Sequence, residues 1–402
     1  MSQPPGDFLV LGGGLVGLAF ANLLAARLPG AAERIVVVDR AAPAPLSADV
    51  GLRVSAWSAA STALLNEAGA WQQVPAARRG PYRRMVVWRS SGPDGRDSIH
   101  FDAAEQGLPA LGHIVENDVL RSLLWDQASQ AGVRFEVGAS PQRLQQDDAG
   151  VQLELDDGRV LTASLLIGAD GQSSWTRQAV GLTRREWSYH QQGLVTHVQP
   201  AEEHQETAWQ RFLPDGPLAL LPLADGRVSV VWSCPVGAAT TLLAGSQAEL
   251  GAALTRASDG VLGELHPTVS ARGFPLMASH THTYTADRVV LIGDAAHQVH
   301  PLAGLGANLG LKDADVLAGE LAAFLHQPAA DPGERKLLRR YERARKGDNL
   351  ATLTTMDLLH RAFSGGQPGL ASLAGTGLGL VDRLPGIKRA IANYAVGDGS
   401  PS

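Results

Sequence analysis

A glycine-rich turn between an apolar strand and an apolar helix is the feature that most restricts the fold of this chain. Residues 7–11 read DFLVL, which suits a short buried strand, and LAFANLLAARL at 18–28 has the apolar spacing of a helix. Between them stand Gly12, Gly14 and Gly17, with the spacing of a GxGxxG turn. Such glycines permit a tight turn, the approach of a pyrophosphate, and close packing of helix on strand. The sequence therefore predicts a Rossmann-type opening.

An acidic residue ends the next predicted strand, RIVVVD at 34–39. Asp39 stands about 20 residues beyond the last glycine, where a carboxylate can accept hydrogen bonds from an adenosine ribose. Strand, turn, helix and acid together predict a dinucleotide site, and a glycine turn without a ligand is the alternative. The turn by itself does not choose between NAD and FAD.

Two later strands also end in an aspartate. ASLLIGADG at 163–171 ends in Asp170 and Gly171, and RVVLIGD at 288–294 ends in Gly293 and Asp294. A nicotinamide dehydrogenase has no evident need for these anchors, whereas an extended FAD must be held along its length. A carboxylate at a strand end can take ribityl or ribose hydroxyls, and a helix N-terminus can approach the flavin ring. The pattern favours FAD.

Composition excludes several other classes of function. The 34 basic and 40 acidic side chains give a net charge of −6, so nucleic acid is not an expected partner. The single Cys234 allows no internal disulfide and no cysteine-built metal site, and we expect no metal. The pair His280 and His282 is interpreted as surface or sheet residues. The sequence shows neither a secretion signal nor an apolar run of the roughly 18 to 20 residues that span a membrane, so a cytoplasmic location is expected.

Several stretches carry a resemblance to a known family. GGGLVG at 12–17, GADGQSS at 168–174 and GDAAHQVHPLAGLGANLGLKDAD at 293–315 together resemble the FAD-dependent aromatic hydroxylases of the p-hydroxybenzoate hydroxylase type. More narrowly, the chain is similar to the ubiquinone-biosynthesis hydroxylases of the UbiH, UbiF and UbiI group. That likeness rests on LGHIVENDVLRSLL (111–124), TAWQRFLPDGPLALLPL (207–223), HPLAGLGANLGL (300–311) and RRYERARKGDN (339–349).

The resemblance implies roles in FAD binding for particular residues. By this likeness, Asp170 with Gly171 belongs to a motif shared between flavin and nicotinamide contacts, and Asp294 after Gly293 meets ribityl or ribose hydroxyls. Arg53 would lie at the phosphate region of FAD, and Asn117 would be a polar flavin contact. The segment against the isoalloxazine ring, where helix N–H groups stabilise negative charge on the reduced ring, would comprise Pro301, Gly306, Ala307 and Asn308.

Two residues of that segment depart from the family pattern. The family usually has Gln at the position of Leu305 and a larger apolar residue at the position of Ala307. Backbone contacts should survive both changes, but the polarity beside the flavin, and with it the substrate or the coupling of reduction to hydroxylation, is left open. His300 is the one weak candidate for a catalytic side chain, with capping or packing as its alternative role. No other residue is assigned to catalysis.

The family likeness implies an FAD-dependent NAD(P)H:O2 monooxygenase. It would hydroxylate the aromatic ring of a polyprenylated phenol in ubiquinone biosynthesis through a flavin C4a-hydroperoxide. The expected partners are this phenol, O2 and NAD(P)H, with other ubiquinone-biosynthesis proteins as further candidates. Two alternatives stay open: a flavin hydroxylase or reductase acting on another aromatic compound, and a non-catalytic FAD-bound scaffold in a biosynthetic assembly. The ring carbon, the choice of NADH or NADPH and the oligomeric state do not follow from the sequence.

Between the second and third aspartate motifs the pattern changes to short strands. TAWQRFL, PLALLPL and RVSVVWSC are separated by PDG and ADG turns, which predicts an antiparallel sheet. Laid across the flavin edge, this sheet would form a wall of the substrate chamber. We expect the alternating side that carries Trp209, Arg211, Leu220, Pro222, Val230 and Trp232 to line it, although the pattern does not determine which face points inward.

The predicted fold class is therefore α/β, a Rossmann-type FAD-binding domain with an inserted, mainly antiparallel substrate sheet and C-terminal helices. The FAD-binding domain is expected in three segments, 1–80, 100–181 and 286–366, and the sheet in 182–285 with 81–99 as an optional hairpin. A helical tail would follow at 367–402. It mixes apolar and basic residues and either rests on the inner face of a membrane or packs on the FAD-binding domain.

Overall fold

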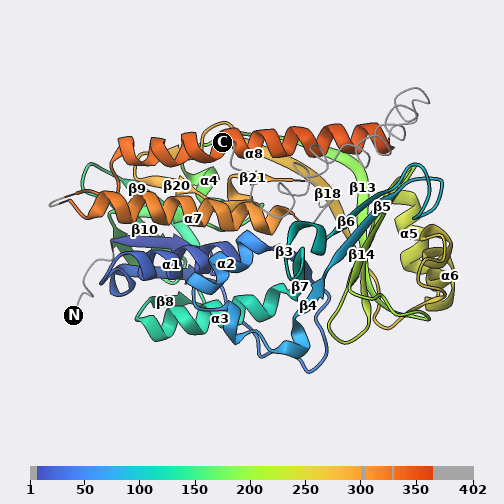
Figure 1. The fold of residues 1–402 in the computed structure, drawn as a ribbon. Helices are drawn as coiled ribbons and strands as arrows, with labels where there is room; N and C mark the ends of the chain where they lie inside the picture. The colour runs from blue at the N-terminus through green and yellow to red at the C-terminus, as the bar shows by residue number, and fades with distance from the viewer. Residues whose placement is uncertain (1–6, 300–304, 328–329, 365–402) are drawn as a thin grey trace.

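The computed structural model describes residues 7–299, 305–327 and 330–364, and side chains at these residues except at Leu305 and beyond residue 358. The predicted tail at 367–402 lies outside these residues, as do His300 and Pro301. The described chain forms two layered regions side by side, a Rossmann-type region and a broad sheet (Figure 1).

The Rossmann-type region is built on a six-stranded sheet in the order β19-β20-β12-β1-β2-β8. Its strands are parallel except for the edge strand β19. Their bounds are Phe8–Leu11 (β1), Ile35–Asp39 (β2), Arg134–Val137 (β8), Leu165–Gly168 (β12), Thr285–Ala286 (β19) and Val289–Leu291 (β20).

Both faces of this sheet are covered, which explains why its strands are apolar at almost every position. Phe8 and Val10 point to one face, which helices α1, α3, α7 and α8 cover, and Leu9 and Leu11 point to the other. That second face packs on a three-stranded antiparallel sheet. The helices are Leu15–Arg27 (α1), Asn117–Ala131 (α3), Trp175–Ala179 (α4), Leu305–Leu325 (α7) and Arg335–Ser364 (α8), and the three strands are Pro141–Gln146 (β9), Val151–Leu155 (β10) and Val160–Ala163 (β11).

A small sheet stands between the two regions, with α2 (Ala59–Glu67) following its first strand. Its order is β3-β7-β4, and the strands span Val54–Ser58 (β3), Gly80–Tyr82 (β4) and Gly112–Glu116 (β7). Five short 3-10 turns complete this side of the described chain: Ala32–Arg34 (η1), Trp71–Gln73 (η2), Ala76–Arg78 (η3), Ala104–Gln106 (η4) and Gly293–Ala295 (η5).

The second region is a nine-stranded sheet with the path β21-β18-β13-β16-β15-β14-β5-β6, and β17 paired to β13. Except for the parallel pair β14 and β5, its neighbours are antiparallel. The strands span Arg84–Trp88 (β5), Ile99–Asp102 (β6), Arg184–Pro200 (β13), Thr207–Leu213 (β14), Gly216–Pro222 (β15), Val228–Pro235 (β16), Leu265–Pro267 (β17), Arg272–Thr281 (β18) and His297–Gln298 (β21).

Strands from distant parts of the chain therefore meet in the broad sheet. β5 and β6 form an antiparallel pair at one edge, and β21 joins the other edge directly after the Gly293 turn. The sheet thus takes strands from inside two segments, 100–181 and 286–366, that the sequence assigns to the FAD-binding domain. The domain boundaries stay a prediction.

Helices α5 (Val236–Ala244) and α6 (Gln247–Ala257) cover one face of the broad sheet, on the side away from the Rossmann region (Figure 1). Leu220 and Val230 pack with Leu250 and Leu254 of α6, and Trp209 and Trp232 lie against the same cluster. The expectation that this side of the strands lines the substrate chamber is therefore wrong. The alternation of the strands was predicted, but it does not reveal which face a later helix pair covers.

Candidate flavin site

The glycine turn at the start of α1 has a separate steric reason for each glycine. Gly12 has a φ of +114°, and a Cβ there would stand 2.3 Å from the carbonyl oxygen of Ala169. A Cβ on Gly17 would stand 2.1 Å from the carbonyl oxygen of Gly12, so this glycine lets helix and turn touch. Gly14 has an ordinary φ of −82° and nothing within 4 Å of a Cβ. Open space thus borders the N-terminus of α1, where free N–H groups can bind an anion.

Asp39 lies beside this turn, as the spacing predicts. Its Oδ2 accepts a hydrogen bond from the Gly13 N–H at 2.7 Å, and its Oδ1 accepts one from the Ala41 N–H at 3.1 Å. The carboxylate therefore stabilises the turn. It also remains partly exposed beside it.

Arg121 of α3 brings positive charge to the same place. Its Nε donates to the carbonyl oxygen of Gly13 at 2.7 Å, and a guanidinium nitrogen stands 3.6 Å from Asp39. Sequence reasoning did not single out this residue. The available signal was its position one helical turn after Asn117, within the segment 111–124 that carried the family likeness.

The Gly293–Asp294 turn meets the glycine turn through Val16. A Cβ on Gly293, which has a φ of +60°, would stand 3.2 Å from Val16, and a Cβ on Gly310 would stand 2.5 Å from the same side chain. Val16 belongs to the first turn of α1 and Gly310 to the second turn of α7. Three segments far apart in the sequence, including two helix N-terminal regions, therefore converge at one point.

The carboxylate of Asp294 accepts no hydrogen bond from any of the described residues. Burial raises its pKa above the usual value, while His297 and Arg53 favour the charged form. A desolvated acceptor without a donor suits a ligand that brings hydroxyl groups to it. The same interaction places Arg53 within electrostatic reach of this carboxylate.

A fully buried carboxylate, that of Asp313 in α7, stabilises the Gly293–Asp294 turn. It accepts the Gly293 N–H at 3.0 Å, lies 2.5 Å from Nε2 of His297, and accepts Nε of Arg345 at 2.8 Å and Nδ2 of Asn349 at 3.1 Å. Burial alone would raise the pKa of Asp313, but His297 and Arg345 hold it well below its usual range. His297 thus belongs to a buried ion-pair network, and Asp313 is a second functional residue that sequence reasoning missed.

The predicted polar contacts Asn117 and Asn308 both hold strand β3. Oδ1 of Asn117 accepts the Ser55 hydroxyl at 2.7 Å, and the Asn117 N–H donates to the carbonyl oxygen of Arg53 at 3.0 Å. Nδ2 of Asn308 donates to the carbonyl oxygen of Ala56 at 2.8 Å, and its Oδ1 accepts the Ser58 N–H at 3.2 Å. The fold thus gathers Arg53, Asn117 and Asn308 around one strand. Gly306 and Ala307 occupy the same first turn of α7 as Asn308.

Asp170 is engaged mainly within the protein. Its carboxylate accepts the Ser174 hydroxyl at 2.6 Å and both the N–H and hydroxyl of Thr176, at 2.8 and 3.0 Å, at the start of α4. The neighbouring Gly171 has a φ of +77° and open space at its Cβ position. The structure thus gives this aspartate a local capping role, and the contact with flavin and nicotinamide stays a prediction.

These features fit an extended FAD. From Asp39 to Gly14 and on to Asp294, the chain offers in order an acid, open space at a helix N-terminus flanked by Arg121, and a carboxylate with no donor among the residues described. The two adjoining helices give backbone N–H groups and positive dipole ends for the pyrophosphate and the ring.

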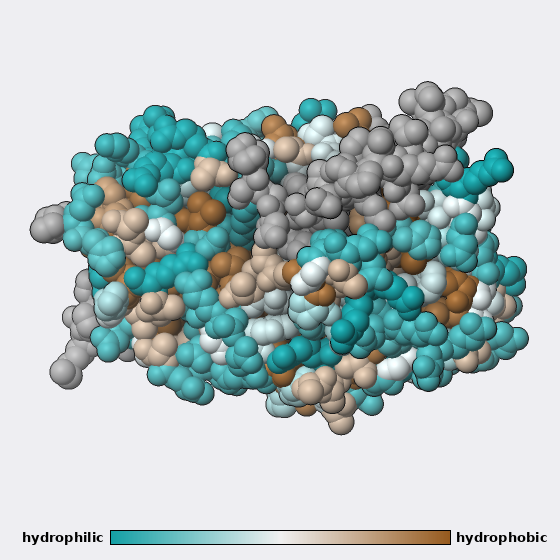
Figure 2. Space-filling view, viewed as in Figure 1, coloured by the Kyte–Doolittle hydropathy of each residue, from teal (hydrophilic) through white to brown (hydrophobic). Residues whose placement is uncertain are grey.

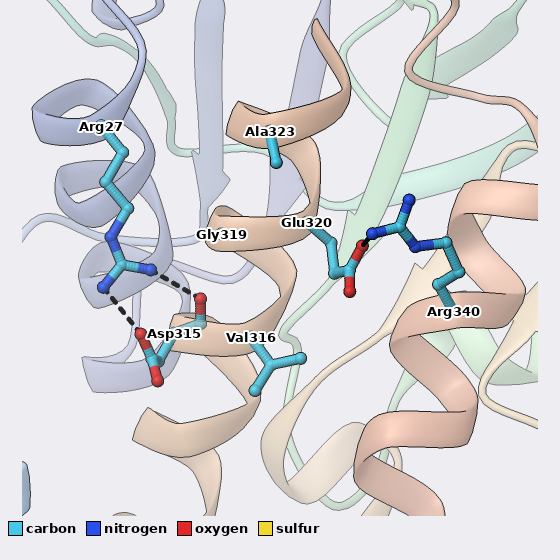
Figure 3. A pocket seen from close by; sticks show the side chains of 7 residues that line it. All are labelled: Arg27, Asp315, Val316, Gly319, Glu320, Ala323 and Arg340. Carbon is cyan, nitrogen blue, oxygen red and sulfur yellow. Dashed lines mark hydrogen bonds and ion pairs between the residues drawn. The ribbon is translucent and has the colours of Figure 1, made fainter.

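A hollow of about 300 Å³ elsewhere on the surface is a different feature. It lies between α1, α7 and α8, and Figure 3 shows Arg27 turned toward Asp315 and Arg340 toward Glu320. Arg27 donates to Asp315 at 2.7 Å, and Arg340 lies 2.8 Å from Glu320. The charged side chains lining it are paired across helices, so it has no free charge for a cofactor. Among the described residues no group of His, Cys, Asp and Glu could hold a metal ion.

Comparison with known proteins points to the same class of site. The pattern of the FAD binding domain family matches residues 6–352. The 3-demethoxyubiquinol 3-hydroxylase of Escherichia coli (strain K12) is 38% identical over 99% of this chain and 100% of its own length. The ubiquinone hydroxylase UbiL of Rhodospirillum rubrum is 34% identical, covering 97% of this chain and 89% of its own.

Solved structures share the fold. The p-nitrophenol 4-monooxygenase PnpA of Pseudomonas putida DLL-E4 superposes with a TM-score of 0.79 at 19% identity, covering 100% of both chains. Klebsiella pneumoniae HpxO, solved with FAD and uric acid, superposes with a TM-score of 0.74 at 20% identity, covering 98% of this chain and 96% of its own.

Proposed function

The chain belongs to the FAD binding domain family, and on that premise we propose that it hydroxylates the aromatic ring of a polyprenylated phenol in ubiquinone biosynthesis. It is an FAD-dependent aromatic-ring monooxygenase that uses NAD(P)H and O2. The observation that carries the substrate is the 38% identity over 99% of the chain to a 3-demethoxyubiquinol 3-hydroxylase. Bound FAD would carry electrons from NAD(P)H to O2 and allow one oxygen atom to be transferred to the ring.

The chain's own residues bind and orient the cofactor. Gly12, Gly14 and Arg121 would hold the pyrophosphate at the N-terminus of α1, and Asp39 would accept adenosine ribose hydroxyls. Asp294 would accept hydroxyls of the sugar chain, because its carboxylate otherwise lacks a donor among the described residues.

The first turn of α7 would direct its N–H groups at the ring system, beside Asn117 and Arg53. Gly171, Gly293 and the predicted contact Pro301 complete the set of residues proposed for cofactor binding. The structure assigns no proton-transfer role to His300, which lies outside the described residues, and its part in catalysis stays a proposal.

The face of the broad sheet opposite α5 and α6 is the better candidate for the chamber wall. In register across four strands stand Val195, Val231, Ala219 and Gln210, and the first three are half-buried although they lie mid-sheet. This face looks toward the small sheet and the Rossmann region (Figure 1). An apolar, partly exposed strip there suits a prenylated ring and excludes water from it.

The test is the lipid content of cells that lack this protein, grown with oxygen, beside cells given it back. Accumulation of one under-hydroxylated prenylphenol, removed on complementation, supports the proposal and names the ring carbon. Unchanged ubiquinone together with NAD(P)H oxidation stimulated by a soluble phenol would assign the enzyme to another aromatic substrate. Bound FAD without any stimulated O2 use would indicate a scaffold.

Two further points of the proposal concern location. Among the described helices none is long and apolar enough to cross a bilayer. A polyprenylated substrate resides in lipid, so the proposed function includes peripheral contact with the inner face of a membrane and with other ubiquinone-biosynthesis proteins. A membrane role for the tail at 367–402 concerns residues outside those that the structure describes.

A further inference from the structure

Helix α8 carries positive charge out of proportion to the rest of the chain. Seven of its first twelve residues are Arg or Lys, in a protein whose net charge is −6. Arg345 is buried against Asp313, Arg340 is paired with Glu320 as Figure 3 shows, and Lys346 stands 3.8 Å from Glu342. These three cations therefore have structural partners.

The other four are exposed and have no partner among the described residues: Arg335, Lys336, Arg339 and Arg343. Residues four apart stand on one side of a helix, so Arg335, Arg339 and Arg343 follow one another on successive turns. We call these four residues the basic strip. Figure 2 shows a hydrophilic surface at the upper left, where Figure 1 places the N-terminal half of α8.

Exposed leucines continue the same side of α8 toward its other end. Leu350 stands two turns beyond Arg343 and is 47% exposed, and Leu358 is 61% exposed. Of the acids in between, Asp348 pairs with Arg345 and Lys312, Glu342 accepts from Thr285 at 2.9 Å, and Asp357 is half-buried. A side with free cations at one end and large apolar groups at the other is typical of a helix that lies in the plane of a bilayer surface.

The position of α8 relates this surface to the substrate. The helix has 30 residues, about 45 Å at 1.5 Å per residue, and it contacts both strand β19 of the Rossmann region and strands β14 and β15 of the broad sheet. A membrane beneath α8 would therefore lie alongside both regions. An acidic protein partner would complement the positive charges of the basic strip, but it would not account for the exposed Leu350 and Leu358.

We propose that the exposed side of α8, from the basic strip to Leu358, is the surface by which this protein docks on an anionic lipid bilayer. This inference rests on the proposed function for its reason, since a polyprenylated phenol must be taken from lipid. The geometry itself is independent of turnover. Docking by these four cations is weakened by salt, because exposed charges are screened over about 10 Å at 0.1 M ionic strength.

The test is sedimentation of the full-length, FAD-loaded protein with vesicles of phosphatidylcholine alone or mixed with phosphatidylglycerol. The combined variant R335Q, K336Q, R339Q and R343Q removes the basic strip. A matched control, R96Q, R143Q, R256Q and R272Q, removes the same charge from exposed arginines on other elements. We expect the wild type and the control to pellet with the anionic vesicles, and partitioning of the strip variant to fall about tenfold or more.

Three results would overturn the proposal: a wild type that ignores anionic vesicles at low salt, a strip variant that binds like the wild type, or a control that loses as much as the strip variant. The first would leave the strip to an acidic protein partner. The flavin spectrum of each protein reports folding and FAD binding separately. Failure of docking is therefore distinguishable from failure of the proposed hydroxylase function.

Discussion

Gly12 and Gly14 stand two residues apart and differ in what a methyl group would meet. At Gly12 the left-handed φ and the 2.3 Å approach to the Ala169 carbonyl oxygen leave no place for a side chain, whereas at Gly14 the space is open. The fold itself requires a glycine at residue 12, whereas nothing in the fold requires one at residue 14, where we propose that the cofactor lies. The GxGxxG pattern predicts both residues and does not distinguish these reasons.

Substituting each glycine by alanine separates them. G12A should be destabilised by at least about 1–3 kcal/mol, because backbone strain adds to the clash. G14A should unfold at a denaturant concentration near that of the wild type and yet bind FAD weakly, because its methyl group enters the ligand's space. Denaturant unfolding and flavin fluorescence titration measure the two effects. A G14A protein that keeps full FAD affinity would contradict the assigned site.

Replacing Asp294 should affect the stability of the FAD-free protein and its affinity for FAD in different ways. Its pKa is raised by burial, so the charged form is disfavoured in the absence of a ligand. D294N should leave the unfolding midpoint of the apoprotein unchanged or raised. It should weaken FAD binding by about 10- to 100-fold, since a hydrogen bond to a charged acceptor contributes about 1.5–3 kcal/mol. Calorimetric titration of apoprotein checks the affinity, and an unchanged affinity would remove Asp294 from the site.

At the scale of elements, α7 and α8 are joined by one buried carboxylate. Asp313 accepts hydrogen bonds from the Gly293 N–H, Arg345 and Asn349 and lies 2.5 Å from His297. The elements themselves were largely predictable, because buried strands and apolar helix faces repeat with fixed periods. The network was not, because the spacing from 313 to 345 carries no period and only packing brings the two helices together.

Removing this charge should destabilise the fold strongly. D313N removes the only buried counter-ion that the described residues give Arg345 and leaves it the exposed Asp348, so we expect a loss of about 3 kcal/mol. Asp315 lies on the same helix as Asp313 and makes a partly exposed pair with Arg27 of α1, so D315N should cost no more than about 1 kcal/mol. Urea unfolding of both variants measures the contrast, and equal losses would refute it.

The same carboxylate sets a pH dependence. Its folded-state pKa is depressed, so its contribution is complete above the unfolded value near about 4 and is lost as the pH falls toward the folded pKa. The wild type should therefore lose stability below about pH 4 more steeply than D313N. Unfolding curves at several pH values would show the difference.

The broad sheet allows a test of which face meets the substrate. V231W fills the half-buried strip opposite α5 and α6, whereas V231I changes its volume little. If this strip is the chamber wall, V231W should raise the KM for the phenol at least about tenfold, because a single methylene already changes binding by roughly 1–3 kcal/mol, about 10- to 200-fold, in an apolar pocket. FAD content should be unchanged in both. A V231W enzyme with wild-type KM would place the substrate elsewhere.

For the whole molecule, the sequence predicted most of the architecture and less of the site. The strand-end acids Asp39 and Asp294 stand where the motifs put them, because a parallel sheet brings the carboxyl ends of its strands to one edge. The predicted orientation of the broad sheet was wrong for Trp209 and Trp232. The positions of α5 and α6 decide which face is covered, and strand alternation does not reveal them. Arg121 was missed because a single basic residue on a helix carries no pattern of its own.

The position of α8 near the end of the described chain predicts how long a chain must be to bind FAD. A chain ending at residue 327 keeps Gly12, Asp39 and Asp294 but loses Arg345 and Asn349 of α8. Asp313 would then be buried without Arg345 or Asn349, and the apolar side of α7 would be uncovered. We expect such a truncation to hold no FAD in a flavin absorbance assay, while removal of residues 367–402 should leave FAD bound.

The six-stranded sheet has a consequence for synthesis on the ribosome. Its central strand β1, made first, pairs with β12 from residue 165 onward, and β12 pairs with β20 from residue 289 onward. At about 5–20 residues per second, β1 waits roughly 15–60 s before the last parallel strand of the sheet exists. Until then its nascent edges are open to other chains, which makes this protein a candidate client of ribosome-associated chaperones. If FAD binding needs Arg345 and Asn349, as we expect, flavin binds only after translation is almost complete, and the flavin absorbance of a preparation then reports chains that were finished.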